Sequence, residues 1–196
     1  MEFLSAHWLD IITTALGLAY ILLEYKASVW MWVVGFMMQS LGIVLYYQKG
    51  LYADCGMEFY YLAMTVYGFI AWMRHKQKVA DLPIRHMPKK MAFIWLGMGL
   101  VIWAFIYFVL SCFTNSNVPV ADAFTTAFSI VGIWALARKY LEQWLVWIVV
   151  DIVTSALYFY KDIPFKASLY ALYVVIAIFG YFKWKQMMAS DQVQTK

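Results

Sequence analysis

The stretch WLVWIVVD at residues 144–151 places one carboxylate inside an apolar run that is long enough to cross a membrane. A charge in the middle of a bilayer costs about 2.5–3.5 kcal/mol on insertion scales, so something must compensate for Asp151. Trp144, Trp147 and Asp151 are spaced by three and four residues and therefore lie on one face of a helix. Because an acid beside two large aromatic rings can receive a flat organic cation, this face predicts a ligand site.

The composition of the whole chain is typical of an integral membrane protein. Of its 196 residues, 65% are hydrophobic and 13% are charged, with a mean hydropathy of +0.69. Soluble domains are nearer 45–50% apolar and 25% charged. Apolar segments of roughly 20 residues predict seven transmembrane helices. The segments lie at about 8–24, 29–47, 54–74, 91–112, 120–138, 143–160 and 166–186, and all four prolines fall between them.

The charges between these segments predict an orientation. Residues 74–90 contain six lysines and arginines against one acid, whereas residues 113–119 carry no charge. Seven spans place the basic stretches on one side, which the positive-inside rule assigns to the cytoplasm. We therefore expect an external N-terminus and a cytoplasmic C-terminus. Glu2 and the lack of early basic residues indicate that the first apolar segment is retained and not cleaved as a signal peptide.

The chain also resembles itself at an offset of 112 residues. Polar, glycine and aromatic residues coincide at this offset, which apolar bias alone does not explain. The pairs include Asp10 and Asp122, Trp32 and Trp144, Lys49 and Lys161, Gly68 and Gly180, and Trp72 and Trp184. We interpret this as two parallel three-helix repeats joined by a linker helix, a 3+1+3 arrangement. The predicted parts are residues 1–74, the first repeat; 75–112, a basic cytoplasmic loop and the linker helix; 113–186, the second repeat; and 187–196, a polar tail.

Parallel repeats of this kind occur in transporters whose substrate site lies near the membrane midplane between the repeats. Polar and aromatic residues within the spans are therefore the candidates for substrate binding. They are Asp151, Trp147, Trp144, Gln39, Glu58, Tyr61, Tyr158 and Tyr173. Gln39 aligns with Asp151 across the repeat, and Tyr61 aligns with Tyr173.

Several of these candidates have a structural alternative. Gln39 could make an interhelical hydrogen bond that only holds the bundle, and Glu58 could reach interfacial water. Trp144 also suits an interfacial aromatic belt, and the tyrosines could pack the helices. Asp122 begins its segment, where helix capping or hydrogen bonding at the outer surface is expected.

Motifs of enzymes are missing from the sequence. It has no H-E-x-x-H, no G-x-S-x-G, no P-loop and no glycine-rich dinucleotide loop. We therefore expect no enzyme, cofactor, metal or nucleic acid, and no built-in ATPase; proton coupling through Asp151 or Glu58 stays open. Cys55 and Cys112 lack metal-ligand spacing and suggest small apolar residues, with a disulfide as the alternative.

Three features resemble the PnuC family of bacterial vitamin transporters over residues 8–186. They are W-x-x-W-x-x-x-D at 144–151, the 3+1+3 duplication, and Leu-Tyr-Ala-Asp at 51–54 before Glu58. The resemblance implies a fold like that of SWEET sugar transporters and facilitated diffusion of an unphosphorylated vitamin across the bacterial inner membrane, by alternating access to a central site. It also implies a homotrimer, and a cytoplasmic kinase that traps the vitamin. A scaffold that binds a ligand without transporting it is the other class to test.

The motif residues bear on the substrate. Nicotinamide riboside members of the family usually have Asn where this chain has Asp151, and often Gln where it has Glu58. Both departures add negative charge. The family includes thiamine transporters of the PnuT type, and thiamine has a cationic thiazolium and an aminopyrimidine that suit a carboxylate. We therefore predict thiamine as the substrate, with nicotinamide riboside, whose pyridinium is also cationic, as the alternative.

Overall fold

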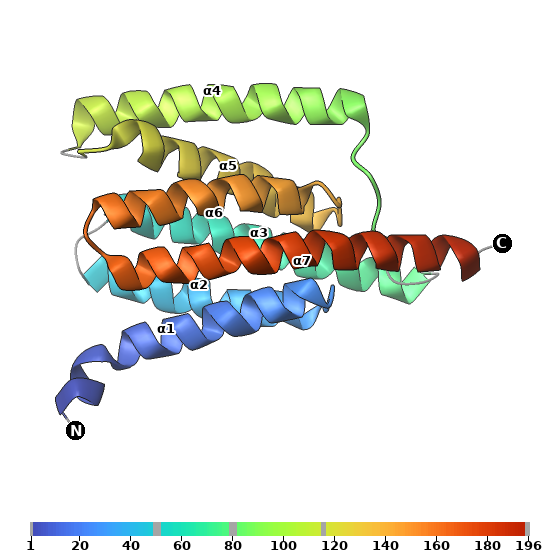
Figure 1. Ribbon diagram of the computed structural model, residues 1–196, viewed down its shortest axis with the longest axis horizontal. Helices are drawn as coiled ribbons and strands as arrows, with labels where there is room; N and C mark the ends of the chain where they lie inside the picture. Colours follow the sequence, from blue (N-terminus) through green and yellow to red (C-terminus); the bar gives the residue numbers. More distant parts are fainter. Residues whose placement is uncertain (1, 49–51, 79–81, 115–116, 195–196) are drawn as a thin grey trace. The chain divides into compact units, whose positions relative to one another are not determined.

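The computed structural model describes residues 2–48, 52–78, 82–114 and 117–194, and these residues form seven helices (Figure 1). The helices are α1 (Glu2–Tyr25), α2 (Trp30–Gln48), α3 (Tyr52–Lys78), α4 (Lys89–Phe113), α5 (Pro119–Ala137), α6 (Gln143–Tyr160) and α7 (Pro164–Gln194). Each overlaps one apolar segment, so the prediction of an all-helical chain of seven helices is confirmed. Pro119 and Pro164 each occupy the first position of a helix, where the missing N–H costs no hydrogen bond.

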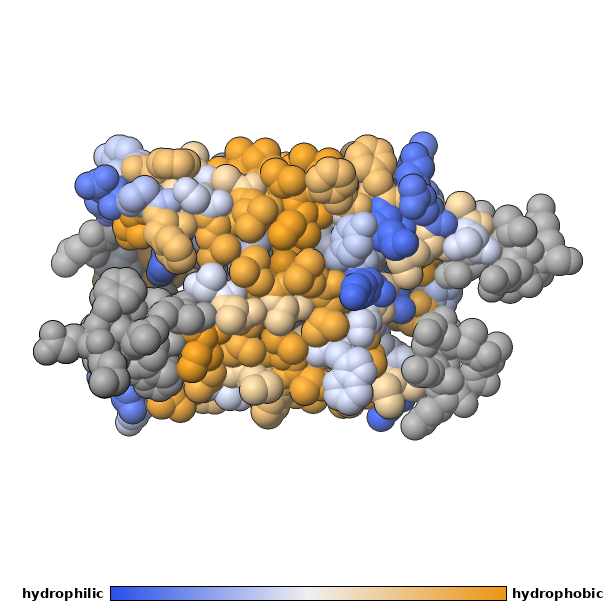
Figure 2. Space-filling model, turned by 60° about the horizontal axis from the view of Figure 1, so that its bottom comes forward, coloured by the Kyte–Doolittle hydropathy of each residue, from blue (hydrophilic) through white to orange (hydrophobic). Residues whose placement is uncertain are grey.

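Five helices are long and apolar enough to cross a membrane within the described residues: α2, α4, α5, α6 and α7. On α4, large side chains such as Phe93 and Val101 are about 70% exposed, with fractions of 74% and 69%. Figure 2 shows hydrophobic side chains across the middle of the face in view. An apolar exterior of this extent is expected in lipid and not in water. Membrane crossing by α1 and α3 stays a prediction.

The helices form two compact units, residues 1–82 and 83–196. In the first unit α1 packs on α2, and α2 packs on α3. In the second unit α4, α5, α6 and α7 pack in that order, each on the next. The helix that the sequence suggests as a linker, α4, therefore belongs to the second unit through its contact with α5. The predicted 3+1+3 arrangement and its boundaries stay predictions, because each unit is described by itself.

The two units share local geometry at the 112-residue offset. Trp32 and Trp72 meet edge to face with ring centroids 5.5 Å apart, and Trp144 and Trp184 do so at 5.6 Å. The turns agree as well: Ala27 and Lys139 have positive φ angles of 50° and 52°. Each of these two residues donates its N–H to the carbonyl three residues earlier, at 2.8 Å and 2.9 Å. The pairs α2–α3 and α6–α7 therefore share a tryptophan contact, and the turns before α2 and α6 share a backbone conformation.

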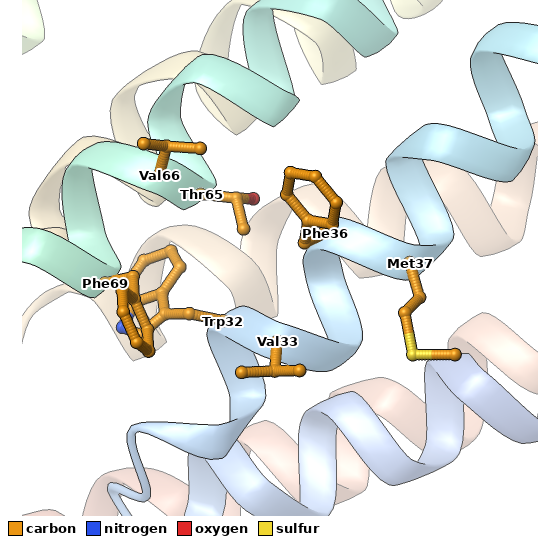
Figure 3. A pocket seen from close by; sticks show the side chains of 7 residues that line it. All are labelled: Trp32, Val33, Phe36, Met37, Thr65, Val66 and Phe69. Carbon is orange, nitrogen blue, oxygen red and sulfur yellow. The ribbon is translucent and has the colours of Figure 1, made fainter.

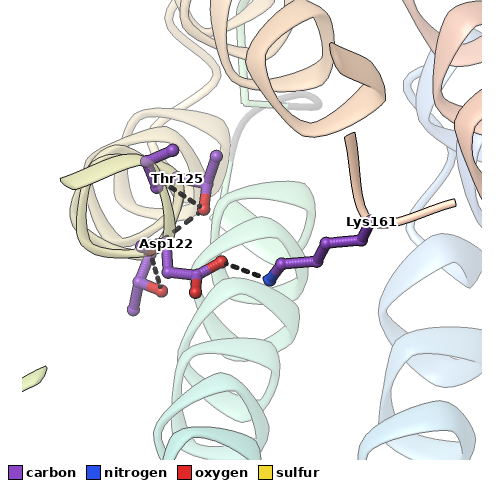
Figure 4. Close-up of polar contacts among 5 residues, drawn as sticks. Asp122, Thr125 and Lys161 are labelled. Carbon is purple, nitrogen blue, oxygen red and sulfur yellow. Dashed lines mark hydrogen bonds and ion pairs between the residues drawn. The ribbon is translucent and has the colours of Figure 1, made fainter. Parts of the chain in front are cut away.

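An ion pair connects the start of α5 to the turn between α6 and α7 (Figure 4). Lys161 Nζ lies 2.9 Å from Asp122 Oδ1, and each side chain is about a quarter exposed. Asp122 is not a helix cap, because α5 begins after Val118 and has no side-chain cap. Of the two expectations for this acid, hydrogen bonding is therefore correct and capping is wrong. The side chains of Asp10 and Lys49, the repeat counterparts, lie outside the described residues.

Both cysteines are free thiols, Cys55 buried and Cys112 exposed. The Cys55 thiol lies 3.7 Å from the carbonyl oxygen of Ile43, so it packs where α3 meets α2. The disulfide alternative is therefore not formed.

The segment before α4 is fixed to the turn that precedes α6. Arg85 donates its N–H to Lys139 O at 3.1 Å and accepts from Leu141 N–H at 3.0 Å, as in a short parallel bridge. The Glu142 carboxylate accepts from the Met87 N–H at 2.8 Å and pairs with His86 Nδ1 at 2.7 Å. One acid at the start of α6 thus holds two consecutive residues of the connecting segment.

We predict that Glu142→Gln loosens this attachment. The amide keeps one acceptor but loses the charge-assisted bonds, which are roughly twice as strong as neutral ones, so we expect a loss of about 1 kcal/mol of local stability. Amide hydrogen exchange should rise at Met87, which measures the attachment directly. Asp162→Asn is the matched control, because it makes the same change from carboxylate to amide at an exposed residue. Unchanged protection of Met87 in Glu142→Gln would contradict the attachment.

Candidate functional site

The buried acid of α6 lies in the second unit. Asp151 is only 6% exposed, and neither ion pair among the described residues involves its carboxylate. The phenol group of Tyr173 on α7 interacts electrostatically with Asp151. A buried carboxylate without a cationic partner is costly, so a positively charged ligand would be stabilised here.

Trp147 is held against α5 by a glycine. The Cβ that Gly132 lacks would lie 3.2 Å from Cε2 and Cζ2 of the Trp147 ring. The indole is half-buried, and its Nε1 is buried without a hydrogen-bond partner among the described residues. At the 112-residue offset, Gly132 corresponds to Tyr20 and Trp147 corresponds to Gly35. The first unit therefore also pairs a large ring with a glycine, but the ring is on α1 and the glycine is on α2. The second unit thus places a tryptophan on α6 where the first has a glycine on α2.

Trp144 is wholly buried between α6 and α7, with an exposed fraction of 0%. Its ring lies over Gly180, whose missing Cβ would be 2.6 Å away, and meets the ring of Trp184 edge to face. It therefore packs two helices and is not part of an exposed aromatic belt. Direct stacking of Trp144 on a substrate stays a prediction.

Two predicted tyrosines belong to an aromatic cluster between α6 and α7. Tyr158 stacks on Tyr170 at 5.4 Å, and Tyr170 meets Tyr173 edge to face at 5.5 Å. The Lys166 ammonium lies 5.5 Å from the centre of the Tyr158 ring. Because Tyr173 also interacts with Asp151, the cluster extends from the acid to the end of α6. Five candidates, Asp151, Trp147, Trp144, Tyr158 and Tyr173, therefore share one helix pair.

The other three candidates lie in the first unit. The Glu58 carboxylate covers Gly42 of α2, with its Cδ 2.7 Å from the position of the missing Cβ. Gln39 lies one turn before Gly42 and on the same face of α2. Tyr61 follows Glu58 on α3 and meets Tyr60 edge to face at 5.7 Å. A further acid, Glu24 at the end of α1, is 4% exposed and was not among the predicted residues.

A cavity of about 280 Å³ lies between α2 and α3 (Figure 3). Its lining is Trp32, Val33, Phe36, Met37, Thr65, Val66 and Phe69. None of the eight candidates contributes to it, and its walls are almost entirely apolar. Nothing there would compensate a charged ligand, so we do not assign this cavity to the substrate. No group of three or more potential metal ligands occurs among the described residues either.

The sequence interpretation missed Gln143, the first residue of α6. This side chain is 0% exposed, and neither its oxygen nor its nitrogen has a hydrogen-bond partner among the described residues. Its repeat counterpart is Met31, which is equally buried. The signal was available in the 112-residue offset: next to the tryptophans Trp32 and Trp144, which coincide at this offset, the polar Gln143 takes the place of the apolar Met31.

Apolar helices that cross a membrane and carry a buried acid between aromatic rings are typical of a membrane transporter of small molecules. The chain belongs to the family described as nicotinamide mononucleotide transporter, which it matches over residues 7–186. This finding confirms the predicted family, and the protein is a multi-pass membrane transporter.

Several characterised proteins are similar over most of their length. The nicotinamide riboside transporter PnuC of Escherichia coli is 25% identical, with 90% of this chain and 84% of that protein covered. The riboflavin/roseoflavin transporter RibM of Streptomyces davaonensis is 27% identical, with the same shares covered. The crystal structure of the vitamin B3 transporter PnuC matches with a TM-score of 0.75 at 21% identity, over 96% of this chain and 85% of that chain. That likeness supports the fold.

Proposed function

We propose that the protein takes up nicotinamide riboside by facilitated diffusion across the inner membrane. The observation that carries the proposal is Asp151, a buried carboxylate that no described residue neutralises, beside the indole of Trp147. The pyridinium of nicotinamide riboside is a flat cation, which such a pair can bind. The relatives named nicotinamide riboside transporters support the same substrate.

The preference for thiamine drawn from the sequence is not supported. It depended on the extra negative charge of Asp151 and Glu58, and a pyridinium meets that charge as well as a thiazolium does. No thiamine transporter is among the relatives described above. Riboflavin, the substrate in the name of RibM, has an uncharged ring system, so it leaves the Asp151 carboxylate without a cationic partner.

The test is uptake into proteoliposomes with labelled nicotinamide riboside, thiamine and riboflavin. We expect saturable uptake of nicotinamide riboside that runs down its gradient and is unaffected by a protonophore. Uptake of thiamine alone would restore the original preference, and a proton-dependent rate would contradict simple facilitated diffusion. Binding of the ligand without any flux would identify a scaffold or receptor instead of a transporter.

Three further expectations belong to this proposal: an external N-terminus, a homotrimer, and a cytoplasmic kinase that traps the vitamin. A kinase enclosed in the proteoliposomes with ATP should raise the final accumulation of label without changing the initial rate. A change in the initial rate would show that the kinase acts on the transporter itself.

A further inference from the structure

An amide without partners lies at the start of the helix that carries the candidate site. Gln143 has an exposed fraction of 0%, and both its Oε1 and its Nε2 are buried without a hydrogen bond to any described residue. Buried polar side chains nearly always have a partner, and one that has none is destabilising. Such a group requires an explanation outside the packing of the helices.

The first unit shows that the fold does not need an amide at this position. Met31, 112 residues earlier, is also 0% exposed. Its N–H bonds to the carbonyl three residues earlier at 3.1 Å, as that of Gln143 does at 3.3 Å. The backbone turn and the burial are therefore the same with an unbranched apolar side chain of similar length. Packing alone therefore explains why a long side chain is buried at this position, but it does not explain why that side chain carries a hydrogen-bond donor and acceptor.

Gln143 shares a face of α6 with two predicted site residues. Gln143, Trp147 and Asp151 are spaced by four residues, so they follow one another along a single stripe. A rise of 1.5 Å per residue puts each about 6 Å from the next along the axis. A ligand ring stacked on Trp147 would therefore lie between two polar side chains: the Asp151 carboxylate one turn further along α6 and the Gln143 amide one turn before it.

We propose that Gln143 binds the amide edge of the substrate, the adjacent C=O and N–H groups that a primary carboxamide or a cyclic imide presents. A side-chain amide has one carbonyl acceptor and an NH₂ donor, so it pairs with such an edge through two hydrogen bonds. This inference rests on the proposed function, since it concerns the same substrate. The nicotinamide carboxamide has this edge, and so does the pyrimidine ring of a flavin; thiamine has no such C=O and N–H pair.

The test is Gln143→Met, which installs the residue that the first unit has at this position. We expect the Kd for nicotinamide riboside to rise about 10- to 100-fold, because the amide edge of the ligand loses both partners. The thermal stability of the ligand-free protein should be equal or higher. Wild type should also prefer nicotinamide riboside over nicotinic acid riboside, which has a carboxylate in place of the carboxamide, and the variant should lose that preference.

The matched control is Met31→Gln, which buries an amide at the equivalent position of the first unit. It should lower the melting temperature and leave the Kd unchanged. An unchanged Kd and ligand preference in Gln143→Met would overturn the inference and assign Gln143 a structural or water-bound role. So would misfolding of both Gln143→Met and Gln143→Leu, because the fold would then require the amide.

Failure of the proposed function is distinguishable from failure of this inference. Wild type that transports riboflavin but not nicotinamide riboside would refute the proposed substrate, and Gln143→Met should then weaken riboflavin binding instead. Wild type that binds neither compound would refute both.

Discussion

Replacing Asp151 with alanine is expected to lower the kcat/KM for nicotinamide riboside uptake by about 30-fold or more. Loss of one partner of a buried charge pair costs about 2–5 kcal/mol, and each 1.4 kcal/mol is a factor of ten. Asp151→Asn keeps the shape and one acceptor, and removes only the charge. We expect it to retain much of the uptake, with a loss of about tenfold, because an amide can still bind a polar group near a cationic ring.

Although Asp151→Ala and Asp151→Asn should lower uptake, we expect the loss of the carboxylate to increase the stability of the ligand-free protein. Asp151 is 6% exposed and takes part in neither ion pair of the described residues, so its removal takes away a desolvated charge. We expect Asp151→Asn to raise the free energy of unfolding by about 1 kcal/mol, which is roughly 2–4 °C in melting temperature for a chain of this size.

The control is Ile152→Ala, next on α6 and 51% exposed, which should change neither uptake nor stability appreciably. Melting curves in detergent and initial uptake rates in proteoliposomes measure the two effects. A loss of stability in Asp151→Asn would indicate that the acid holds the bundle together. Full uptake by Asp151→Ala would remove it from the site.

The apolar segments were predictable because lipid imposes a length of about 20 residues and excludes unsatisfied backbone. The contact of Trp144 with Gly180 was also readable in principle, since both residues recur 112 positions from Trp32 and Gly68. When a segment is duplicated, two residues that contact each other in one copy tend to be retained together in the other copy. A pattern along the chain cannot show which face each ring covers, and Trp144 therefore looked as suitable for the membrane interface as for the core.

Other features could not be predicted because they depend on contacts between distant residues. The pairing of Lys161 with Asp122 requires the α6–α7 turn to meet the start of α5, and hydropathy carries no information on that distance. Glu142 gave no sign that it binds Met87 and His86. The preference for thiamine lacked support for a similar reason: a carboxylate indicates a cation, but it does not distinguish one aromatic cation from another.

Replacing Gly180 with alanine should destabilise the second unit by about 1–3 kcal/mol, the usual cost of overfilling a packed core. The new Cβ would lie 2.6 Å from Cη2 of Trp144, closer than real side chains approach. The ring cannot move outwards, because its exposed fraction is 0% and Trp184 lies against it. The melting temperature should fall by roughly 2–4 °C for each kcal/mol.

Gly97→Ala is the matched control, since a Cβ on Gly97 in α4 would meet nothing within 4 Å. It should be neutral or slightly stabilising, because alanine favours helix over glycine by about 1 kcal/mol. Equal melting temperatures for the two variants would contradict the close contact between Gly180 and Trp144. The Gly180→Ala variant also tests the ring itself, because any adjustment to the new methyl displaces Trp144. A changed Kd for nicotinamide riboside would then place this ring in contact with the substrate or with Trp147, whereas lower stability with an unchanged Kd would limit Trp144 to packing α6 on α7.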